Sequence, residues 1–231
     1  MRTLLIIPAF NEEANILKTY NTIIEYNHSH NTHFDVIVIN DGSTDNTLNI
    51  CKENNIPVIS LIHNLGIGGA VQTGYKYAYM YNYDIAVQYD GDGQHDVRYV
   101  DDITKPLLNN EVDFVVGSRF VDESSSEFKS TMQRRMGIKL ISSFIKFKTG
   151  KRILDTTSGF RAINKNIICE FAHNYPTEYP EPITNARLLK QGYRVKEVPV
   201  AMHEREGGES SIKASKAVYY MLNVLFGIIT L

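Results

Sequence analysis

The sequence predicts an α/β fold with a mainly parallel sheet, because short apolar runs alternate with helical stretches along its first half. Runs rich in β-branched residues, typical of strands covered on both faces, occupy residues 4–7, 36–39, 58–61, 85–89 and 112–116. Helical patterns separate them at residues 12–26, 44–53, 69–81 and 97–108. This alternation implies right-handed crossovers and parallel strands, whose carboxyl ends form one ligand-binding edge.

Beyond residue 119 the pattern changes to a mixture of loops, helices and shorter strands. A serine-rich polar loop is expected at residues 123–130, followed by a basic amphipathic helix at residues 131–148. Further on we expect a helix at residues 182–191 and strands at residues 194–197 and 200–203.

The composition is that of a globular protein. The 231 residues suffice for one large domain, which we expect at residues 1–213, followed by an apolar segment at residues 214–231. A formal net charge of −2 gives no global reason to expect nucleic acid. Cys51 and Cys169 lie far apart without metal-ligand spacing, and the first apolar run is too short for a signal peptide. These features indicate reduced thiols in a cytosolic compartment.

An acidic pair directly follows the fourth predicted strand. Asp90 and Asp92 are two residues apart, so each disfavours ionisation of the other unless a cation neutralises both. Hard divalent ions such as Mg²⁺ or Mn²⁺ take carboxylate oxygens and share them with phosphates, which suggests a diphosphate substrate. A plain polar turn is the alternative for an isolated pair of this kind. An EF-hand does not fit, because His95 stands where that loop requires glycine.

The segment after the second predicted strand begins at Asp41. Ser43 and Thr44 are candidates for a helix N-cap, which would explain the segment without any ligand. An aspartate at a strand end can also accept hydrogen bonds from a nucleobase, and Glu12 can accept them from ribose hydroxyls. Together the two carboxylates would hold a nucleoside. The glycines at residues 66–69 lack the position and the full fingerprint of a dinucleotide-binding loop.

Several arginines lie near the predicted crevice. The guanidinium groups of Arg119, Arg134 and Arg135 can each hold phosphate through two hydrogen bonds, although a solvated surface explains any one of them. Arg205 lies in a glycine-containing loop at residues 204–211 that could close over a diphosphate. A plain flexible turn is the alternative for that loop.

Eight segments in order along the chain resemble the family 2 glycosyltransferases, and more narrowly their dolichol-phosphate and polyprenyl-phosphate sugar transferase branch. The similarity spans about residues 3–213, and the ordered set is far more specific than any one segment. The segments are PAFNE at 8–12, NDGSTD at 40–45, NLG at 64–66, DGDGQH at 90–95, GSR at 117–119, DTTSGFR at 155–161, EVP at 197–199 and REGGESS at 205–211.

This resemblance implies a GT-A fold and an inverting transfer from a nucleotide sugar. It implies that Asp41 recognises the base and Glu12 the ribose. The remaining implied donor residues are Pro8 and Phe10 around the nucleoside, Asp90, Gly91 and Asp92 at the sugar and diphosphate, and Arg205 and Ser211. The implied metal ligands are Asp90, Asp92 and Gln94.

The acceptor side is implied in the same way. Gln94, Ser118, Arg119 and Arg134 would receive the acceptor phosphate, and Asp92, Arg119 and Asp155 form the predicted catalytic set.

Two positions depart from the family pattern. Asn40 replaces the first aspartate of the usual Asp-Asp-Gly-Ser, and Ser211 stands where many relatives carry lysine. The second departure leaves Lys213 as a conjectural substitute.

The need for a protein base depends on the acceptor. A lipid phosphate is ionised near neutral pH and needs none, whereas a sugar hydroxyl would require Asp155 or Glu181 to accept a proton. Asp155 is equally explained as a structural cap of the turn at Ser158 and Gly159. The leaving diphosphate gains negative charge, which a metal ion and Arg205 would stabilise.

Basic and apolar side chains share the predicted helix at residues 131–148, a composition typical of helices in an anionic membrane interface. From Lys129 to Arg152 there are eight Lys or Arg residues and no Asp or Glu. Core packing with a solvated basic face is the alternative. Residues 218–231 are apolar except for Asn223 and Thr230, but they reach only about 21 Å as a helix, short of the ~30 Å hydrocarbon core. We expect a second interfacial helix there, or a docking surface for a small membrane protein.

Together these predictions describe a peripheral enzyme at the cytoplasmic face of the membrane. The resemblance to short bacterial members of the branch implies transfer of glucose or N-acetylglucosamine from a UDP-sugar to undecaprenyl phosphate, with Mg²⁺ or Mn²⁺, for cell-wall or surface-polysaccharide modification. One alternative is a transferase that extends a glycan at a hydroxyl. Another is a catalytically silent subunit that binds nucleotide sugar and recruits a membrane partner, although the retained carboxylates, Gln94 and Arg205 argue against it.

Overall fold

The computed structural model describes the backbone of residues 1–121, 132–202 and 217–231, and the side chains of residues 1–121, 135–202 and 219–231. Within these residues a seven-stranded sheet has the order β3-β2-β1-β4-β6-β5-β7. Its strands are β1 (Thr3–Ala9), β2 (Phe34–Asn40), β3 (Val58–Ser60), β4 (Ile85–Gln88), β5 (Phe114–Ser118), β6 (Arg161–Asn164) and β7 (Val195–Pro199).

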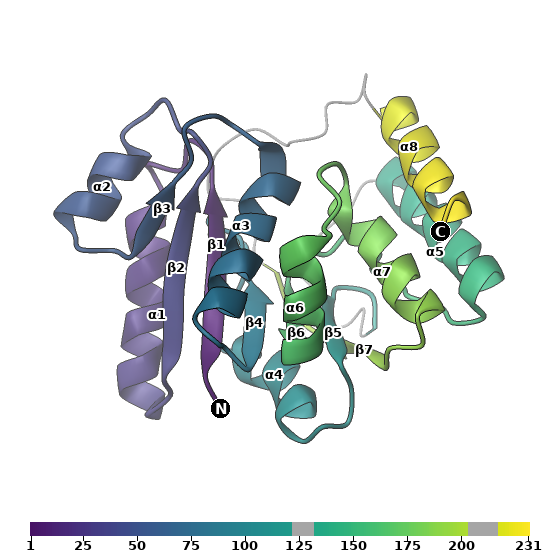
Figure 1. Cartoon of the computed structure of the whole chain (residues 1–231), viewed down its shortest axis with the longest axis horizontal. Helices are drawn as coiled ribbons and strands as arrows, with labels where there is room; N and C mark the ends of the chain where they lie inside the picture. The colour runs from purple at the N-terminus through teal and green to yellow at the C-terminus, as the bar shows by residue number, and fades with distance from the viewer. Residues whose placement is uncertain (122–131, 203–216) are drawn as a thin grey trace.

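The sheet is parallel apart from β6, which runs antiparallel between β4 and β5. The carboxyl ends of β1, β2, β4 and β5 therefore lie along one edge of the sheet, the edge toward which the arrowheads of β1 and β2 point in Figure 1. This arrangement confirms the predicted α/β class and the largely parallel sheet.

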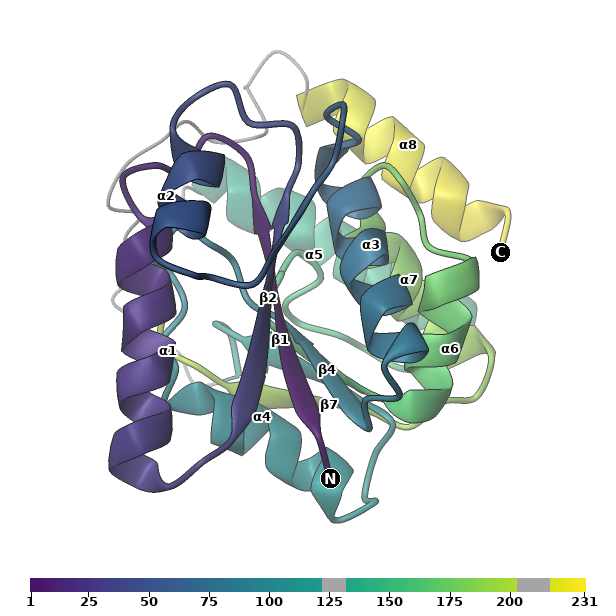
Figure 2. The ribbon, with the colours of Figure 1, turned by 60° about the vertical axis from the view of Figure 1, so that its left-hand side comes forward.

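Helices cover both faces of the sheet, and Figure 2 shows α1 and α3 on opposite sides of β1 and β2. One core lies against α1 (Ile16–His30), α2 (Thr47–Glu53) and α4 (Tyr99–Leu108). The other lies against α3 (Gly66–Met80) and α6 (Lys165–His173). Residues of β1 alternate between the two cores, as the two-residue period of a strand requires: Leu5 and Ile7 contact the first, and Leu4 and Ile6 the second.

A third, smaller core joins α5 (Met132–Thr149), α7 (Pro180–Lys190) and α8 (Ala217–Ile229) at one end of the molecule. Ile141 and Ile145 of α5 pack there with Val224 and Ile228 of α8. The helices predicted at residues 131–148 and 182–191 are thus confirmed with small shifts in their bounds. In the described parts of the chain, no helix combines the length and the apolar character that crossing a membrane requires.

Three elements differ from the sequence-based expectations. β6 was not predicted, because its fully buried Arg161 interrupts the apolar run that would have marked a strand. α6, directly after β6, was also missed. The predicted strand at residues 200–203 is wrong over its described residues: β7 ends at Pro199, and Met202 makes only an isolated bridge with His95. The predicted loop at 123–130 lies outside the described residues, as does the boundary between residues 213 and 214.

Candidate active site

The loops that follow β1 and β2 are tied together by hydrogen bonds. The backbone N–H of Asn11 donates to Ser43 Oγ at 3.0 Å, and the N–H of Thr44 donates to Asn11 Oδ1 at 2.8 Å. The N–H of Glu12 donates to Thr47 Oγ1 at 2.9 Å. Asn11 adopts a φ of 57°, a left-handed conformation that asparagine tolerates better than most residues. The two loops that carry the predicted nucleoside-binding residues are therefore joined to each other by hydrogen bonds.

Asp41 lies buried at the end of β2, where its carboxylate is held by the main chain. Asp41 Oδ1 accepts a hydrogen bond from the N–H of Leu65 at 2.7 Å. Burial raises the pKa of this carboxyl above its ordinary value, although the N–H of Leu65 opposes the rise. Gly42 next to it has a φ of 67°, and a Cβ there would lie 2.8 Å from the Asn64 nitrogen, so the turn requires glycine.

The other predicted nucleoside contacts lie near Asp41. Glu12 Oε2 accepts a hydrogen bond from Nδ2 of Asn15, the residue directly before α1, at 3.0 Å, and this bond orients the Glu12 carboxylate. Phe10 is 47% exposed, whereas Pro8 is buried within β1. The N–H of Asp41 donates to the Ala9 carbonyl oxygen at 2.8 Å, so the two segments run side by side, and the exposed ring of Phe10 is available for stacking on a base.

Asn40, the departure from the family's first aspartate, has both ends of its amide satisfied. Its Nδ2 donates to Ser60 Oγ at 2.8 Å on β3, and its Oδ1 accepts from the N–H of Ser43 at 3.3 Å. A neutral amide thus closes the turn without adding a second buried carboxylate beside Asp41.

The acidic pair occupies a tight turn after β4. Asp92 Oδ1 accepts from the N–H of Gln94 at 3.1 Å. Asp90 Oδ1 accepts from Gln88 Nε2 at 3.4 Å. Gly159 faces this carboxylate so closely that a Cβ there would lie 2.8 Å from Asp90 Oδ2. Glycine at 159 is therefore what leaves room for Asp90.

His95 fixes the main chain of this turn. Its Nδ1 accepts from the N–H of Asp90 at 3.0 Å, and burial lowers its pKa, so the neutral ring carries its hydrogen on Nε2. That nitrogen lies 3.6 Å from Asp90 Oδ2. The ring stacks on Phe160 at a centroid distance of 4.6 Å, and Tyr89 OH donates to the His95 carbonyl oxygen. The final histidine of DGDGQH is thus a structural anchor of the acidic turn.

The donor set of this turn fits a hard divalent cation. Asp90 is partly exposed and Asp92 is buried, and both supply carboxylate oxygens. Among the described residues no group of three or more His, Cys, Asp or Glu side chains is placed to hold a metal ion. The pair therefore suits an ion shared with a diphosphate and water, as Mg²⁺ and Mn²⁺ sites commonly are, and not a closed structural site.

Arg119 and Asp155 form a buried ion pair after β5. The Asp155 carboxylate accepts from Arg119 Nε and Nη2, both at 2.7 Å, and from the Arg119 backbone N–H at 3.1 Å. Arg119 is 6% exposed and Asp155 is 0% exposed. Arg119 Nη2 also donates to Thr157 Oγ1 at 3.1 Å. The structure thus brings two predicted catalytic residues into direct contact, and Asp155 is engaged as the partner of Arg119.

The rest of the predicted acceptor and donor sets is only partly described. Ser118, at the end of β5, is buried, and its Oγ accepts from the N–H of Phe120 at 3.4 Å. Arg134 lies in the first turn of α5, but its side chain is outside the described residues. Arg205, Ser211 and Lys213 also lie outside them. Their predicted roles stay predictions.

The sequence does not single out Gln88 and Arg161, two buried polar residues near Asp90 that surround the candidate base Glu181. Arg161, wholly buried on β6, donates to the Ser158 carbonyl oxygen and to Thr184 Oγ1, both at 2.8 Å. Gln88 pairs with Arg161 across the sheet and also interacts with Glu181. Burial raises the pKa of Glu181, opposed by Arg161. The available signals are the amide of Gln88, two residues before Asp90, and the arginine at the start of β6.

Glu181 is presented by a strained turn. Tyr179, the residue before Pro180, has a φ of 48°, which is uncommon for a non-glycine residue and disfavoured before proline. Such strain often accompanies functional sites. Of the two candidate bases, Asp155 is locked to Arg119, whereas Glu181 is partly exposed and lies near Asp90.

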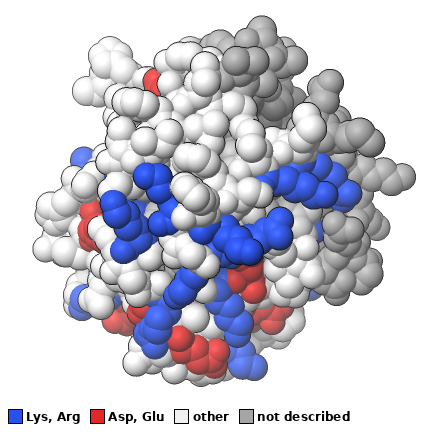
Figure 3. Space-filling model, turned by 90° about the vertical axis from the view of Figure 1, so that its right-hand side faces the viewer, with Lys and Arg blue, Asp and Glu red and all other residues white. Residues whose placement is uncertain are grey.

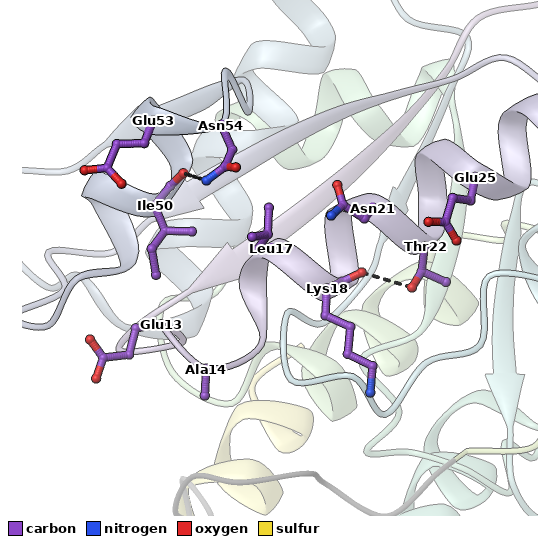
Figure 4. Close-up of a pocket in the computed structure, with 10 residues that line it drawn as sticks. All are labelled: Glu13, Ala14, Leu17, Lys18, Asn21, Thr22, Glu25, Ile50, Glu53 and Asn54. Carbon is purple, nitrogen blue, oxygen red and sulfur yellow. Dashed lines mark hydrogen bonds between the residues drawn. The ribbon is translucent and has the colours of Figure 1, made fainter.

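Two grooves in the described residues lie outside the proposed active site. The first, of about 810 Å³, runs between α1 and α2 and is lined mainly by polar side chains such as Glu13, Lys18 and Glu53 (Figure 4). The second, of about 340 Å³, lies between α1 and residues 93–97. Neither is lined by Asp41, Asp90 or Arg119, so we assign the chemistry to the edge of the sheet.

A sheet of this topology, with hydrogen-bonded loops after β1 and β2 and an acidic pair after β4, is that of the GT-A class of glycosyltransferases. The chain belongs to glycosyl transferase family 2, whose pattern matches residues 4–171. This confirms the resemblance noted from the eight segments.

Two relatives cover most of the chain. The UDP-N-acetylglucosamine–dolichyl-phosphate N-acetylglucosaminyltransferase of Methanococcus voltae is 34% identical over 216 residues, covering 85% of this chain and 83% of that protein. The undecaprenyl-phosphate mannosyltransferase of Micrococcus luteus is 26% identical over 235 residues, covering 97% and 93%.

A solved structure shares the fold. Glucosyl-3-phosphoglycerate synthase from Mycobacterium tuberculosis, in complex with Mn²⁺, UDP and glucosyl-3-phosphoglycerate, matches with a TM-score of 0.71 at 18% identity. The match covers 99% of this chain and 79% of that one. At this identity the likeness is one of fold.

Proposed function

We propose that this protein transfers a sugar from a nucleotide sugar, with UDP-glucose or UDP-N-acetylglucosamine as donor, to polyprenyl phosphate. The observation that carries the proposal is a pair of opposite charges at one edge of the sheet: an acidic pair after β4 and, after β5, an arginine that Asp155 holds in place and that interacts electrostatically with Asp90. The relatives whose names specify dolichyl and undecaprenyl phosphate support the lipid acceptor.

On the donor side, Asp41 accepts hydrogen bonds from the base, Glu12 binds the ribose, and Phe10 stacks beside them. Asp90 and Asp92 face the sugar and the diphosphate. A divalent ion bound by these two carboxylates would neutralise negative charge on the leaving diphosphate. The Mn²⁺ and UDP bound by the structural neighbour support this donor chemistry.

On the acceptor side, Arg119 and Ser118 bind the lipid phosphate, with Arg134 as a further contact. One phosphate oxygen attacks the anomeric carbon, a new carbon–oxygen bond forms, and the bond to the nucleoside diphosphate breaks with its electron pair leaving on that diphosphate. Attack from the face opposite the leaving group inverts the anomeric centre. Because the attacking oxygen is already ionised near neutral pH, no protein base is needed. Asp155 can therefore serve as the partner that orients Arg119.

We also propose that the end of the molecule formed by α5 and α8 meets an anionic membrane. Figure 3 shows Lys and Arg gathered in a band across this end, beside an area of uncharged residues. A basic band beside exposed apolar side chains suits a lipid surface that contains anionic headgroups. Exposed apolar side chains line one side of each helix: Met136, Leu140 and Phe147 on α5, and Tyr219, Leu222, Phe226 and Ile229 on α8.

Vesicle flotation tests the membrane face. Replacement of Phe147 and Phe226 by Ser should reduce binding to vesicles that contain phosphatidylglycerol. The matched control replaces Ile62 and Met80, which are equally exposed but lie outside α5 and α8, and should bind like wild type. Equal binding of both double variants would remove the proposal, and binding only to a co-purified membrane protein would favour a protein partner.

The transfer itself is tested with labelled UDP-glucose, UDP-N-acetylglucosamine and GDP-mannose, each incubated with undecaprenyl phosphate and Mn²⁺. We expect label to enter the organic phase from one UDP-sugar, and to be lost in the Asp92→Asn variant. The absence of organic-extractable label from every donor, with nucleotide-sugar binding intact, would favour a silent binding subunit.

A hydroxyl acceptor is the second candidate, and the position of Glu181 beside Asp90 favours it. A hydroxyl must lose a proton, and a partly buried carboxyl with a raised pKa is suited to accept one. Glu181→Gln should abolish transfer to a sugar hydroxyl but preserve much of the transfer to lipid phosphate. The matched control is Glu178→Gln, three residues earlier and exposed.

A further inference from the structure

Arg119 is held by a series of contacts that ends at Glu197 on β7. The Asp155 carboxylate binds Arg119 through three hydrogen bonds. The main chain of Asp155 is fixed in turn, because its N–H donates to Glu197 Oε1 at 2.8 Å. The N–H of Leu154 donates to Glu197 Oε2, also at 2.8 Å. The two oxygens of one carboxylate thus hold two successive main-chain N–H groups.

The sheet gives Glu197 a fixed position relative to Arg119. Glu197 on β7 is in register with Val116 on β5, and Arg119 follows three residues later on the same segment. The series of contacts therefore starts at Glu197 on β7 and ends at Arg119, which directly follows the neighbouring strand β5. The intervening residues 154–155 are thereby held between two adjacent strands.

A carboxylate is specifically required for this geometry. Both of its oxygens accept hydrogen bonds, and charge-assisted bonds to backbone N–H groups are stronger than neutral ones. Glutamine at the same position could accept only one of the two N–H groups and would direct its own NH₂ at the other. The turn at residues 154–155 would then have to move, and Asp155 with it.

We propose that Glu197 is a positioning residue for the acceptor phosphate: it sets the orientation of the Arg119 guanidinium through Asp155, without touching substrate. This inference rests on the proposed function, in which Arg119 binds that phosphate. Because Arg119 uses Nε and Nη2 on Asp155, this two-point contact sets the rotation of its planar guanidinium, and Thr157 adds a further contact at Nη2. A displaced Asp155 therefore redirects the remaining N–H groups of Arg119.

A second contact of Arg119 offers an independent variant. Thr157 Oγ1 accepts from Arg119 Nη2 at 3.1 Å and lies outside the contacts of Glu197. Thr157→Val removes this acceptor at nearly constant volume. Like Glu197→Gln, Thr157→Val should weaken the binding of the acceptor phosphate and leave UDP binding unchanged. The loss should be smaller, because Asp155 still holds the guanidinium.

The test compares Glu197→Gln, Thr157→Val and the control Glu111→Gln, an exposed glutamate whose ion-pair partner Lys196 neighbours Glu197. For each protein, titration calorimetry measures the affinity for octyl phosphate and, separately, for UDP with Mn²⁺. We expect Glu197→Gln to weaken octyl phosphate binding about tenfold, as loss of one charge-assisted hydrogen bond predicts. UDP binding should stay unchanged, Thr157→Val should show a loss of a few fold, and Glu111→Gln none.

A purely structural role for Glu197 predicts a different result. Glu197→Gln would then lower Tm and leave both affinities, per folded molecule, at the wild-type value, and that outcome would overturn the inference. Steady-state kinetics adds a second readout, because a positioning role raises KM for the acceptor and leaves KM for the donor unchanged. Equal effects on both KM values would also count against it.

A crystal structure of Glu197→Gln separates this inference from the proposed function. If Arg119 keeps its wild-type orientation, the positioning role fails whatever the enzyme transfers. If wild-type protein ignores octyl phosphate while the Arg119 guanidinium of the variant moves, the positioning is correct and the acceptor assigned to Arg119 is wrong.

Discussion

The proposed donor and acceptor sides of the site hold their charged groups in different ways. On the proposed donor side, formed by the loops after β1, β2 and β4, Asp41 and Asp92 accept hydrogen bonds from the main-chain N–H groups of Leu65 and Gln94. On the proposed acceptor side, formed by the end of β5, residues 154–159 and β7, Arg119 and Asp155 hold each other.

This difference determines how far a substitution should act. When a carboxylate held by the main chain is changed to an amide, the N–H groups that donate to it can still donate to the amide oxygen. Removal of one member of a buried ion pair leaves the other charge uncompensated, which is costly. Donor-side substitutions should therefore change function locally, whereas acceptor-side substitutions should also lower the free energy of unfolding.

The largest loss of activity is expected for Asp92→Asn. We expect kcat to fall about a thousandfold, because a carboxylate that supports the charge of the leaving group is lost. The unfolding free energy should stay near wild type, because the N–H of Gln94 can still donate to the amide oxygen. Urea unfolding and single-turnover transfer assays measure the two quantities. A large drop in stability would contradict the local character of the donor side.

Asp155→Asn should combine a smaller loss of activity with a large loss of stability. The buried guanidinium of Arg119 would lose its counter-charge, and we expect unfolding to become easier by about 3–5 kcal/mol. Activity should fall about a hundredfold as Arg119 loses its orientation. An Asp155→Asn variant as stable as wild type would show that the two sides do not differ in the way described.

Gly159→Ala probes the boundary between the two sides. The added Cβ would lie 2.8 Å from Asp90 Oδ2 and 3.0 Å from Gln88 Nε2, so Asp90 must move. We expect the affinity for Mn²⁺ with UDP to drop by about ten- to thirtyfold, of the order of one lost charge-assisted hydrogen bond. The control is Gly137→Ala in α5, where the nearest atom, Met221 Sδ, is 3.6 Å away. That variant should gain about 0.5–1 kcal/mol of stability and keep its affinity.

Asp41→Asn should weaken UDP binding about tenfold at neutral pH, because one charged acceptor becomes neutral. Burial raises the pKa of Asp41, so in wild type UDP binding should fall as pH drops through a value above the ordinary 3.8. A raised carboxyl pKa also means that ionisation costs the folded state stability as pH rises through the same range. Asp41→Asn should lack both dependences, which binding and urea unfolding measured across pH can check.

The smallest effect is expected for Asn40→Asp, which restores the usual family residue. The carboxylate can still accept from the N–H of Ser43, and the hydroxyl of Ser60 can become the donor. Donor KM should change by no more than about twofold, equivalent to a few tenths of a kcal/mol. A tenfold change would show that the amide itself selects the donor.

The sequence predicted the donor side better than the acceptor side, for a physical reason. Donor residues follow strands whose apolar runs are continuous, so their convergence at one edge of the sheet could be deduced from the pattern alone. The contact between Arg119 and Asp155 joins residues far apart in sequence through an antiparallel strand, β6, that a buried arginine concealed. No periodicity marks such a pair.

Residues that act through others were the hardest to predict. Glu197 belongs to the EVP segment and His95 to DGDGQH, but their contacts with main-chain N–H groups appear only in three dimensions. Carboxylates and imidazoles that fix backbone geometry have no spacing rule that distinguishes them from surface groups. Glu181 was considered as a base, yet its position beside Gln88 and Arg161 depends on the turn at Tyr179.

The proposed transfer is tested most directly by a crystal of the protein soaked with UDP-sugar, Mn²⁺ and octyl phosphate, with anomalous data collected at the manganese edge. We expect an anomalous peak between Asp90, Asp92 and the diphosphate, and the octyl phosphate group on Arg119 with the Asp155 pair intact. A manganese peak away from both carboxylates, or a phosphate bound elsewhere with Arg119 unoccupied, would contradict it.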